Sequence, residues 1–175
     1  PGDWKQVKPR SGIIQYEFQV PAAKQKPSEE ADSAPAEGED KSGSNQKDDQ
    51  QQSKELGRMT VMSAGGSLEL NVARWKEQFR TDDGKPLQKT NDEVIQQVEV
   101  GPLTAHVVDL VGTYLEQPRG PRGPTVRKPE HRMLAAIVPT ERDGMWFIKY
   151  YGPRKSVDSQ AESFRKMIEG MEWKE

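Results

Sequence analysis

The stretch Met133–Tyr151, MLAAIVPTERDGMWFIKYY, decides the fold. Residues 133–138 are all apolar, as in a strand that is covered on both faces. Residues 142–144 are the turn residues Arg, Asp and Gly, and residues 145–151 then place aromatic side chains on both faces of a second strand. The stretch therefore predicts a hairpin whose first strand is central and fully buried.

Strand patterns recur on both sides of this hairpin. Ile13 to Val20 alternates apolar and polar residues, which predicts a strand with Tyr16 and Phe18 facing inward and Glu17 facing water. Further strands are predicted over residues 59–63, 94–100 and 103–113, and Gly101–Pro102 joins the last two as a second hairpin.

Two segments have the apolar spacing of amphipathic helices. In Ser67–Arg80 the apolar stripe consists of Leu68, Val72, Trp75 and Phe79. Near the C-terminal end, Ser159 and Glu162 have the spacing of a capping box, which marks a helix start. The stripe of this second helix consists of Ala161, Phe164, Ile168 and Met171. We expect both stripes to be buried.

Two polar segments differ in composition from the rest of the chain. Residues 25–55 hold nine acids against four bases, a net charge of −5, and their only apolar residues are three alanines. Burial cannot repay the entropy of ordering such a segment, so we predict a disordered acidic insertion within a single domain that spans residues 1–175. An acidic interaction tail is the alternative. For residues 117–130 we predict a basic Pro/Gly loop between two strands. The alternative is that this segment is a ligand for a domain that recognises polyproline helices.

Composition also excludes several classes of function. The chain has 175 residues and no cysteine, which removes disulfides and thiolate metal sites. Its net charge of −2 gives no indication of a nucleic-acid partner, and no apolar run approaches the roughly 20 residues that cross a bilayer. Because the chain begins with Pro1 in place of methionine, we expect an upstream segment, where a signal peptide or a lipid anchor would lie.

The sequence has no recognisable catalytic or metal-binding motif. His106 and His131 lack a second ligand at metal-binding spacing, so we interpret both as structural. Asp109 interrupts the apolar run VVDLVG, where a carboxylate could serve acid–base chemistry, and we interpret it as structural too. The alternative is an enzyme of unknown class that uses Asp109 or His106 in a cleft.

Several segments resemble one protein family. They are GGSLELNVARWKEQF (65–79), DLVGTY (109–114), MLAAIV (133–138) and WFIKYYGP (146–153), followed by a helix that contains SFRKMI (163–168). These segments are similar to a group of exported bacterial proteins, frequent in planctomycetes, with the fold of PsbP, the extrinsic photosystem II protein. The resemblance implies an α+β fold in which helices flank a central antiparallel sheet, an α/β/α sandwich. It also implies a non-catalytic accessory domain outside the cytoplasm, periplasmic or lipid-anchored.

We therefore expect an exported binding domain that docks to a protein or a small ligand. We expect it to be a monomer and to use no cofactor or metal. The predicted binding residues are Arg74, Lys149 and Tyr151. Lys149 and Tyr151 share the strand face expected to reach solvent, and Arg74 lies about 100° around the first helix from its buried stripe. A cytosolic adaptor that uses the proline-rich loop is a third hypothesis.

Overall fold

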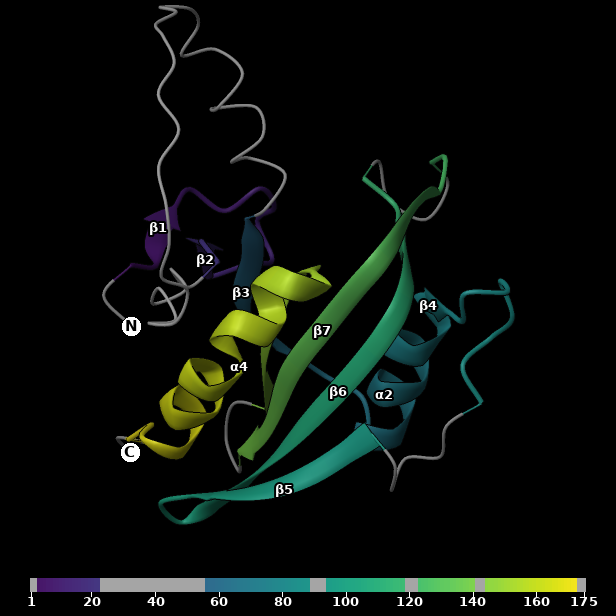
Figure 1. Cartoon of the computed structure of the whole chain (residues 1–175). Coiled ribbons are helices and arrows are strands. Elements are labelled where there is room, and N and C mark those ends of the chain that lie inside the picture. The colour runs from purple at the N-terminus through teal and green to yellow at the C-terminus, as the bar shows by residue number, and fades with distance from the viewer. Residues whose placement is uncertain (1–2, 23–55, 89–93, 119–122, 141–143, 173–175) are drawn as a thin grey trace, which may run out of the picture.

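The computed structural model describes residues 3–22, 56–88, 94–118, 123–140 and 144–172. Within these residues, one sheet of eight antiparallel strands has the order β1-β2-β3-β8-β7-β6-β4, and β5 also pairs with β6 (Figure 1). The strands are β1 Lys5–Val7, β2 Tyr16–Val20, β3 Gly57–Ala64, β4 Phe79–Arg80, β5 Ile95–Val100, β6 Leu103–Glu116, β7 Val126–Thr140 and β8 Gly144–Pro153. The helices are α2 Leu68–Glu77 and α4 Arg154–Glu169.

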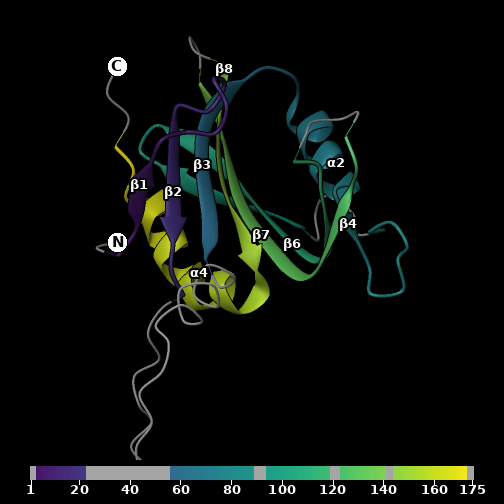
Figure 2. The ribbon, with the colours of Figure 1, turned by 90° about the horizontal axis from the view of Figure 1, so that it is seen from above.

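The two helices lie on opposite sides of the sheet (Figure 2). On one side, α4 buries Val157, Phe164 and Ile168 against the sheet. On the other, α2 buries Val72 and Trp75 in a separate apolar cluster. Apolar side chains of β6, β7 and β8 contribute to both clusters because alternate residues of a strand face opposite sides. The predicted α+β class, an antiparallel sheet flanked by helices, is thereby confirmed.

The central hairpin forms as predicted. Strand β7 lies between β6 and β8, and Met133 to Val138 are at most 1% exposed. The second predicted hairpin is present as β5 and β6, joined at Gly101, whose φ of 57° suits a residue without a side chain. The wholly apolar run was therefore a correct sign of a strand covered on both faces.

The first helix is shorter than the sequence predicts. It ends at Glu77, and Phe79–Arg80 leaves the helix to form β4 against Tyr114 and Thr113 of β6. Gly112 permits this pairing because it has no side chain. A Cβ at this position would lie only 2.3 Å from the Arg80 carbonyl oxygen. Phe79 is still fully buried, but as a strand residue. Ser67 caps the start of the helix by accepting a hydrogen bond from the Leu70 N–H.

The second helix starts earlier than its capping-box spacing indicates. It begins at Arg154, directly after Pro153, whose fixed φ suits a helix start. Ser159 is inside the helix, where its hydroxyl donates to the Ser156 carbonyl oxygen at 2.8 Å. The early start buries Val157, so tertiary packing overrides the local capping signal.

The predicted inward face of the first strand is wrong in part. Strand β2 begins at Tyr16, and Tyr16 is 50% exposed whereas Glu17 is 1% exposed. Glu17 faces inward because β3 supplies an arginine partner. The predicted loop over 117–130 is also shorter, since residues 126–130 belong to β7.

The predicted insertion over 25–55 lies outside the described residues. Neither helix of the described ranges is long and apolar enough to cross a membrane.

Candidate functional site

The α2 side of the sheet changes from apolar to polar along β8. Phe147, Lys149 and Tyr151 share this side, and Trp75 of α2 lies against the first two of them. Trp75 of α2 meets Phe147 edge-on, with ring centroids 5.3 Å apart and planes at 79°. Farther along the strand, Lys149 and Tyr151 are half-buried. The expectation that this strand face reaches solvent is therefore met at its Tyr151 end and not at Phe147, which is 4% exposed.

A buried ion pair organises the Tyr151 end of this side. Arg58 of β3 donates to both carboxylate oxygens of Glu17, from Nε at 2.8 Å and Nη2 at 3.0 Å. The backbone N–H of Arg10 donates to the same carboxylate at 2.9 Å. Burial alone would raise the pKa of Glu17, but the hydrogen bonds and charges of Arg58 and Arg10 outweigh it and hold this pKa below 4.5. The third nitrogen of Arg58, Nη1, donates to the Tyr151 hydroxyl.

Lys149 lies between two aromatic rings on this side. Its Nζ is 5.0 Å from the Trp75 ring centroid and 5.8 Å from that of Tyr151, within the range of cation–π attraction. Among the described residues, no carboxylate forms an ion pair with it. Burial, together with the charge of Arg58, lowers the pKa of Lys149 to about 8.

A β-bulge positions the next aromatic residues. The β6–β7 register shifts between Gly112 and Tyr114, opposite Pro129 and Glu130 of β7. Glu130 has a φ of 49°, a left-handed conformation that is uncommon for a residue with a side chain. The shift brings Tyr114 beside His131, with ring centroids 6.4 Å apart and planes at 12°. Bulges and such backbone strain often occur at functional sites because they redirect side chains.

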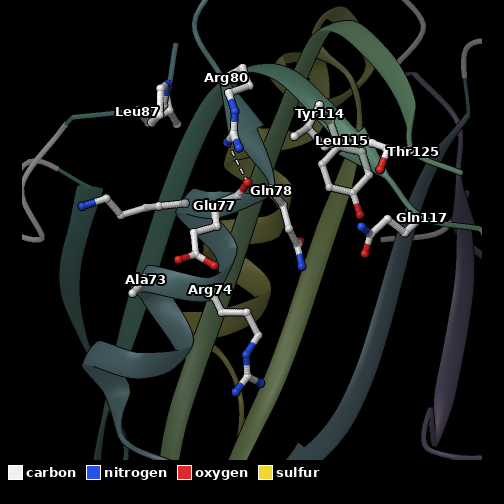
Figure 3. Close-up of a pocket in the computed structure, with 12 residues that line it drawn as sticks. Ala73, Arg74, Glu77, Gln78, Arg80, Leu87, Tyr114, Leu115, Gln117 and Thr125 are labelled. Atoms are coloured by element: carbon white, nitrogen blue, oxygen red, sulfur yellow. Dashed lines mark hydrogen bonds between the residues drawn. The ribbon is translucent and has the colours of Figure 1, made fainter. Parts of the chain in front are cut away.

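Two cavities meet at Tyr114. The larger has a volume of about 1140 Å³ and opens between α2 with β4 on one side and the end of the β6–β7 hairpin on the other. Figure 3 shows the residues that line this cavity. Arg74 and Glu77 come from α2 and Arg80 from β4, while Tyr114 belongs to β6 and Gln117 directly follows that strand. Arg80 is held in place because it donates to the Glu77 carbonyl oxygen at 2.8 Å.

The smaller cavity lies on the other side of Tyr114 and has a volume of about 320 Å³. Its lining residues are Arg10, Leu56, Arg58, Tyr114, Glu116, Lys128, His131, Tyr151, Gly152 and Pro153. His131 Nδ1 is 2.8 Å from the Pro129 carbonyl oxygen, which fixes the ring, and burial lowers the pKa of His131, so its neutral form is favoured. The cavity is thus lined by fixed rings and by cations.

The three predicted binding residues fall on the same side of the sheet but in different places. Arg74 is exposed and lines the larger cavity, and Tyr151 lines the smaller one. Lys149 lines neither cavity and lies behind Tyr151. Sequence reasoning missed Tyr114 and Arg58. The motif DLVGTY contains Tyr114, and strand alternation puts it on the side of Leu110, but the bulge in β7 that brings His131 beside it was not predicted.

The residues of the enzyme alternative lie away from these cavities. Asp109 accepts two hydrogen bonds from Arg132, at 2.9 and 2.6 Å, and Arg132 also donates to Asp158 of α4 at 2.7 Å. This cluster joins β6 and β7 to α4, on the opposite side of the sheet. His106 lines neither cavity. Within the described ranges, no three His, Asp or Glu side chains come close enough together to hold a metal ion.

Comparison of the chain with family models, with curated proteins and with solved structures gave no match.

Proposed function

We propose that this protein is a non-catalytic binding domain whose recognition surface is the α2 side of the sheet around Tyr114. One observation carries the proposal: two cavities meet at this ring, and basic side chains outnumber acidic ones in both linings. The larger cavity has three bases, Arg74, Lys76 and Arg80, against Glu77. The smaller has Arg10, Arg58 and Lys128 against Glu116. Concave sites with fixed rings and converging polar groups are the usual form of a ligand site.

The absence of a catalytic arrangement in these cavities supports binding over turnover. Nucleophilic catalysis needs a nucleophile within hydrogen-bond reach of a base that is itself oriented by a third group. The described linings hold one histidine, His131, whose Nδ1 is 2.8 Å from a backbone carbonyl oxygen. Asp109, the acid of the alternative hypothesis, is paired with Arg132 on the far side of the sheet.

The same proposal includes a PsbP-like α/β/α sandwich that acts outside the cytoplasm as an accessory domain. The arrangement of one helix on each side of an antiparallel sheet supports the sandwich. The segments quoted above for the family resemblance support export.

The proposal is tested with Arg74→Ala, Lys149→Ala and Tyr151→Ala in a pull-down and a small-molecule screen. Lys155→Ala is the matched control, because Lys155 is exposed on α4 at the opposite side of the sheet. Each variant is first checked for an unchanged melting curve. We expect Arg74→Ala and Tyr151→Ala to weaken binding about tenfold or more, as for a residue at the centre of an interface. Unaltered binding in all three folded variants would exclude this surface, and turnover abolished by Asp109→Asn would favour the enzyme.

A further inference from the structure

We propose that the smaller cavity, beside Tyr151, is a binding site for a small oxyanion, a phosphate or carboxylate group carried by a small molecule. This inference rests on the binding function proposed above and names the chemical class of its ligand. It follows from three properties of the described residues: an excess of positive charge, an excess of hydrogen-bond donors, and a cavity of the size of a small ligand.

The excess of positive charge is found by pairing each cation with its carboxylate. Glu17 is a single carboxylate shared by two guanidiniums, with Arg58 Nε at 2.8 Å and Arg10 Nε at 3.2 Å. Lys128 Nζ is 3.7 Å from Glu116. Two positive charges then lack a carboxylate of their own in the described part of the chain. One is that of Arg10, whose side chain is 66% exposed, because Arg58 holds both carboxylate oxygens of Glu17. The other is that of Lys149, which lies behind Tyr151 and outside the lining.

Arg58 and Lys149 both lie close to the ring of Tyr151. The Arg58 guanidinium carbon and Lys149 Nζ are each 5.8 Å from the Tyr151 ring centroid. Burial is the main cause of the lowered pKa of Lys149, about 8, and the positive charge of Arg58 adds to it. Buried charges in proteins are normally paired, and Arg58 already has Glu17 as its partner, so an anion against Tyr151 would chiefly offset the charge of Lys149.

The lining also offers donors where an anion needs them. Because the Tyr151 oxygen accepts from Arg58, its own O–H is left to donate to another group. Lys128 and Arg10 add further donors, whereas Glu116 is the one acidic side chain of the described lining. The volume of about 320 Å³ is at the lower end of the range for small-molecule sites. A phosphate monoester or a free carboxylate fits these donors, and a flat portion of the ligand would contact the stacked rings of Tyr114 and His131.

The first test measures the pKa of Lys149 by NMR of ¹³C-labelled lysine, with the signal assigned through Lys149→Arg. Inorganic phosphate and succinate are the two probes, and chloride at matched ionic strength is the control. Nζ is 5.8 Å from the ring centroid of Tyr151, so a bound anion lies within roughly 10 Å of it and should raise this pKa by about one unit. A rise with phosphate alone assigns a phosphate ligand, and a rise with succinate alone assigns a carboxylate. No rise with either probe overturns the site.

A second test uses stability and does not depend on the NMR assignment. Lys149→Met removes a charge without a counter-ion, so in buffer free of oxyanions the variant should melt at or above the temperature of the parent. In phosphate the parent should gain more stability than the variant, because the variant keeps the donors of the lining but loses the positive charge behind Tyr151. Lys155→Met, on the exposed face of α4, should follow the parent in both buffers. A Lys149→Met variant that is equally stabilised by phosphate contradicts the assignment.

Neither test needs the partner of the proposed function. Loss of partner binding in Arg74→Ala with no response to phosphate or succinate would remove the oxyanion site and leave the recognition surface. A response to phosphate with unaltered partner binding in all three alanine variants would remove the recognition surface and leave the oxyanion site.

Discussion

Replacing Glu17 by Gln should destabilise the protein strongly, although the two side chains have nearly the same shape. Glu17 is 1% exposed and accepts hydrogen bonds from Arg58 Nε, Arg58 Nη2 and the Arg10 N–H. A glutamine would turn its NH₂ group toward at least one of these donors and leave the Arg58 charge without a partner. Removing one member of a buried ion pair costs about 3–5 kcal/mol of unfolding free energy.

Denaturant unfolding at several pH values is the assay. The folded-state pKa of Glu17 is lowered from 4.5, so its contribution to stability is present above pH 4.5 and is lost as the pH falls through the folded-state value. The difference between the parent and Glu17→Gln should therefore be largest near neutral pH and shrink below pH 4.5. Glu162→Gln is the control. Glu162 pairs with Lys166 on the exposed face of α4, so this variant should unfold like the parent. A difference below about 1 kcal/mol at neutral pH, or one that does not shrink in acid, would refute the buried pair.

Three further predictions concern the framework of the site. Trp75→Ala removes a side chain that is 4% exposed, so the unfolding free energy should fall by about 3–5 kcal/mol, measured by denaturant unfolding; unchanged unfolding with lost partner binding would mean that the Trp75 face is an interface. Gly112→Ala should lower the melting temperature and separate β4 from β6, because its Cβ would lie 2.3 Å from the Arg80 carbonyl oxygen; a parent-like melting curve would contradict the close approach. Replacing residues 25–55 by a short Gly/Ser linker should leave the melting temperature within a few degrees, since that segment offers almost no apolar area; a large loss of cooperativity would show that it packs.

Much of the fold was predictable because the sheet is specified by local patterns. The apolar run 133–138 and the Gly101 turn each encode their structure within a few residues, and both hairpins formed as predicted. The helix ends were not predictable in the same way. Phe79 continues the helical stripe in sequence. In the structure it joins the sheet, because Gly112, which is distant in sequence, has no side chain to keep β4 away from β6.

The site was predictable only in outline. Helical spacing placed Arg74 on the open face of α2, and strand alternation placed Lys149 and Tyr151 on one side of the sheet. The burial of Glu17 depends on Arg58, which is 41 residues away. Alternation placed Glu17 correctly on the face opposite Phe18, but it gave no sign that this face is covered. The contact of Tyr114 with His131 depends on a bulge in β7 that no local pattern signals. Contacts between distant segments therefore decide which polar residues meet.

An amide chemical-shift map of the ¹⁵N-labelled protein shows directly whether the α2 side of the sheet is the recognition surface. The protein would be titrated with a mixture of small phosphates and carboxylates, and the residues whose amide signals move would be placed on the structure. We expect the shifts to gather around Tyr114, Lys149 and Tyr151, on the α2 side of the sheet, and to spare Lys155 and its neighbours on α4. Shifts that gather on α4 would contradict the assignment of the α2 side as the recognition surface, whereas no shifts at all would contradict the oxyanion site alone.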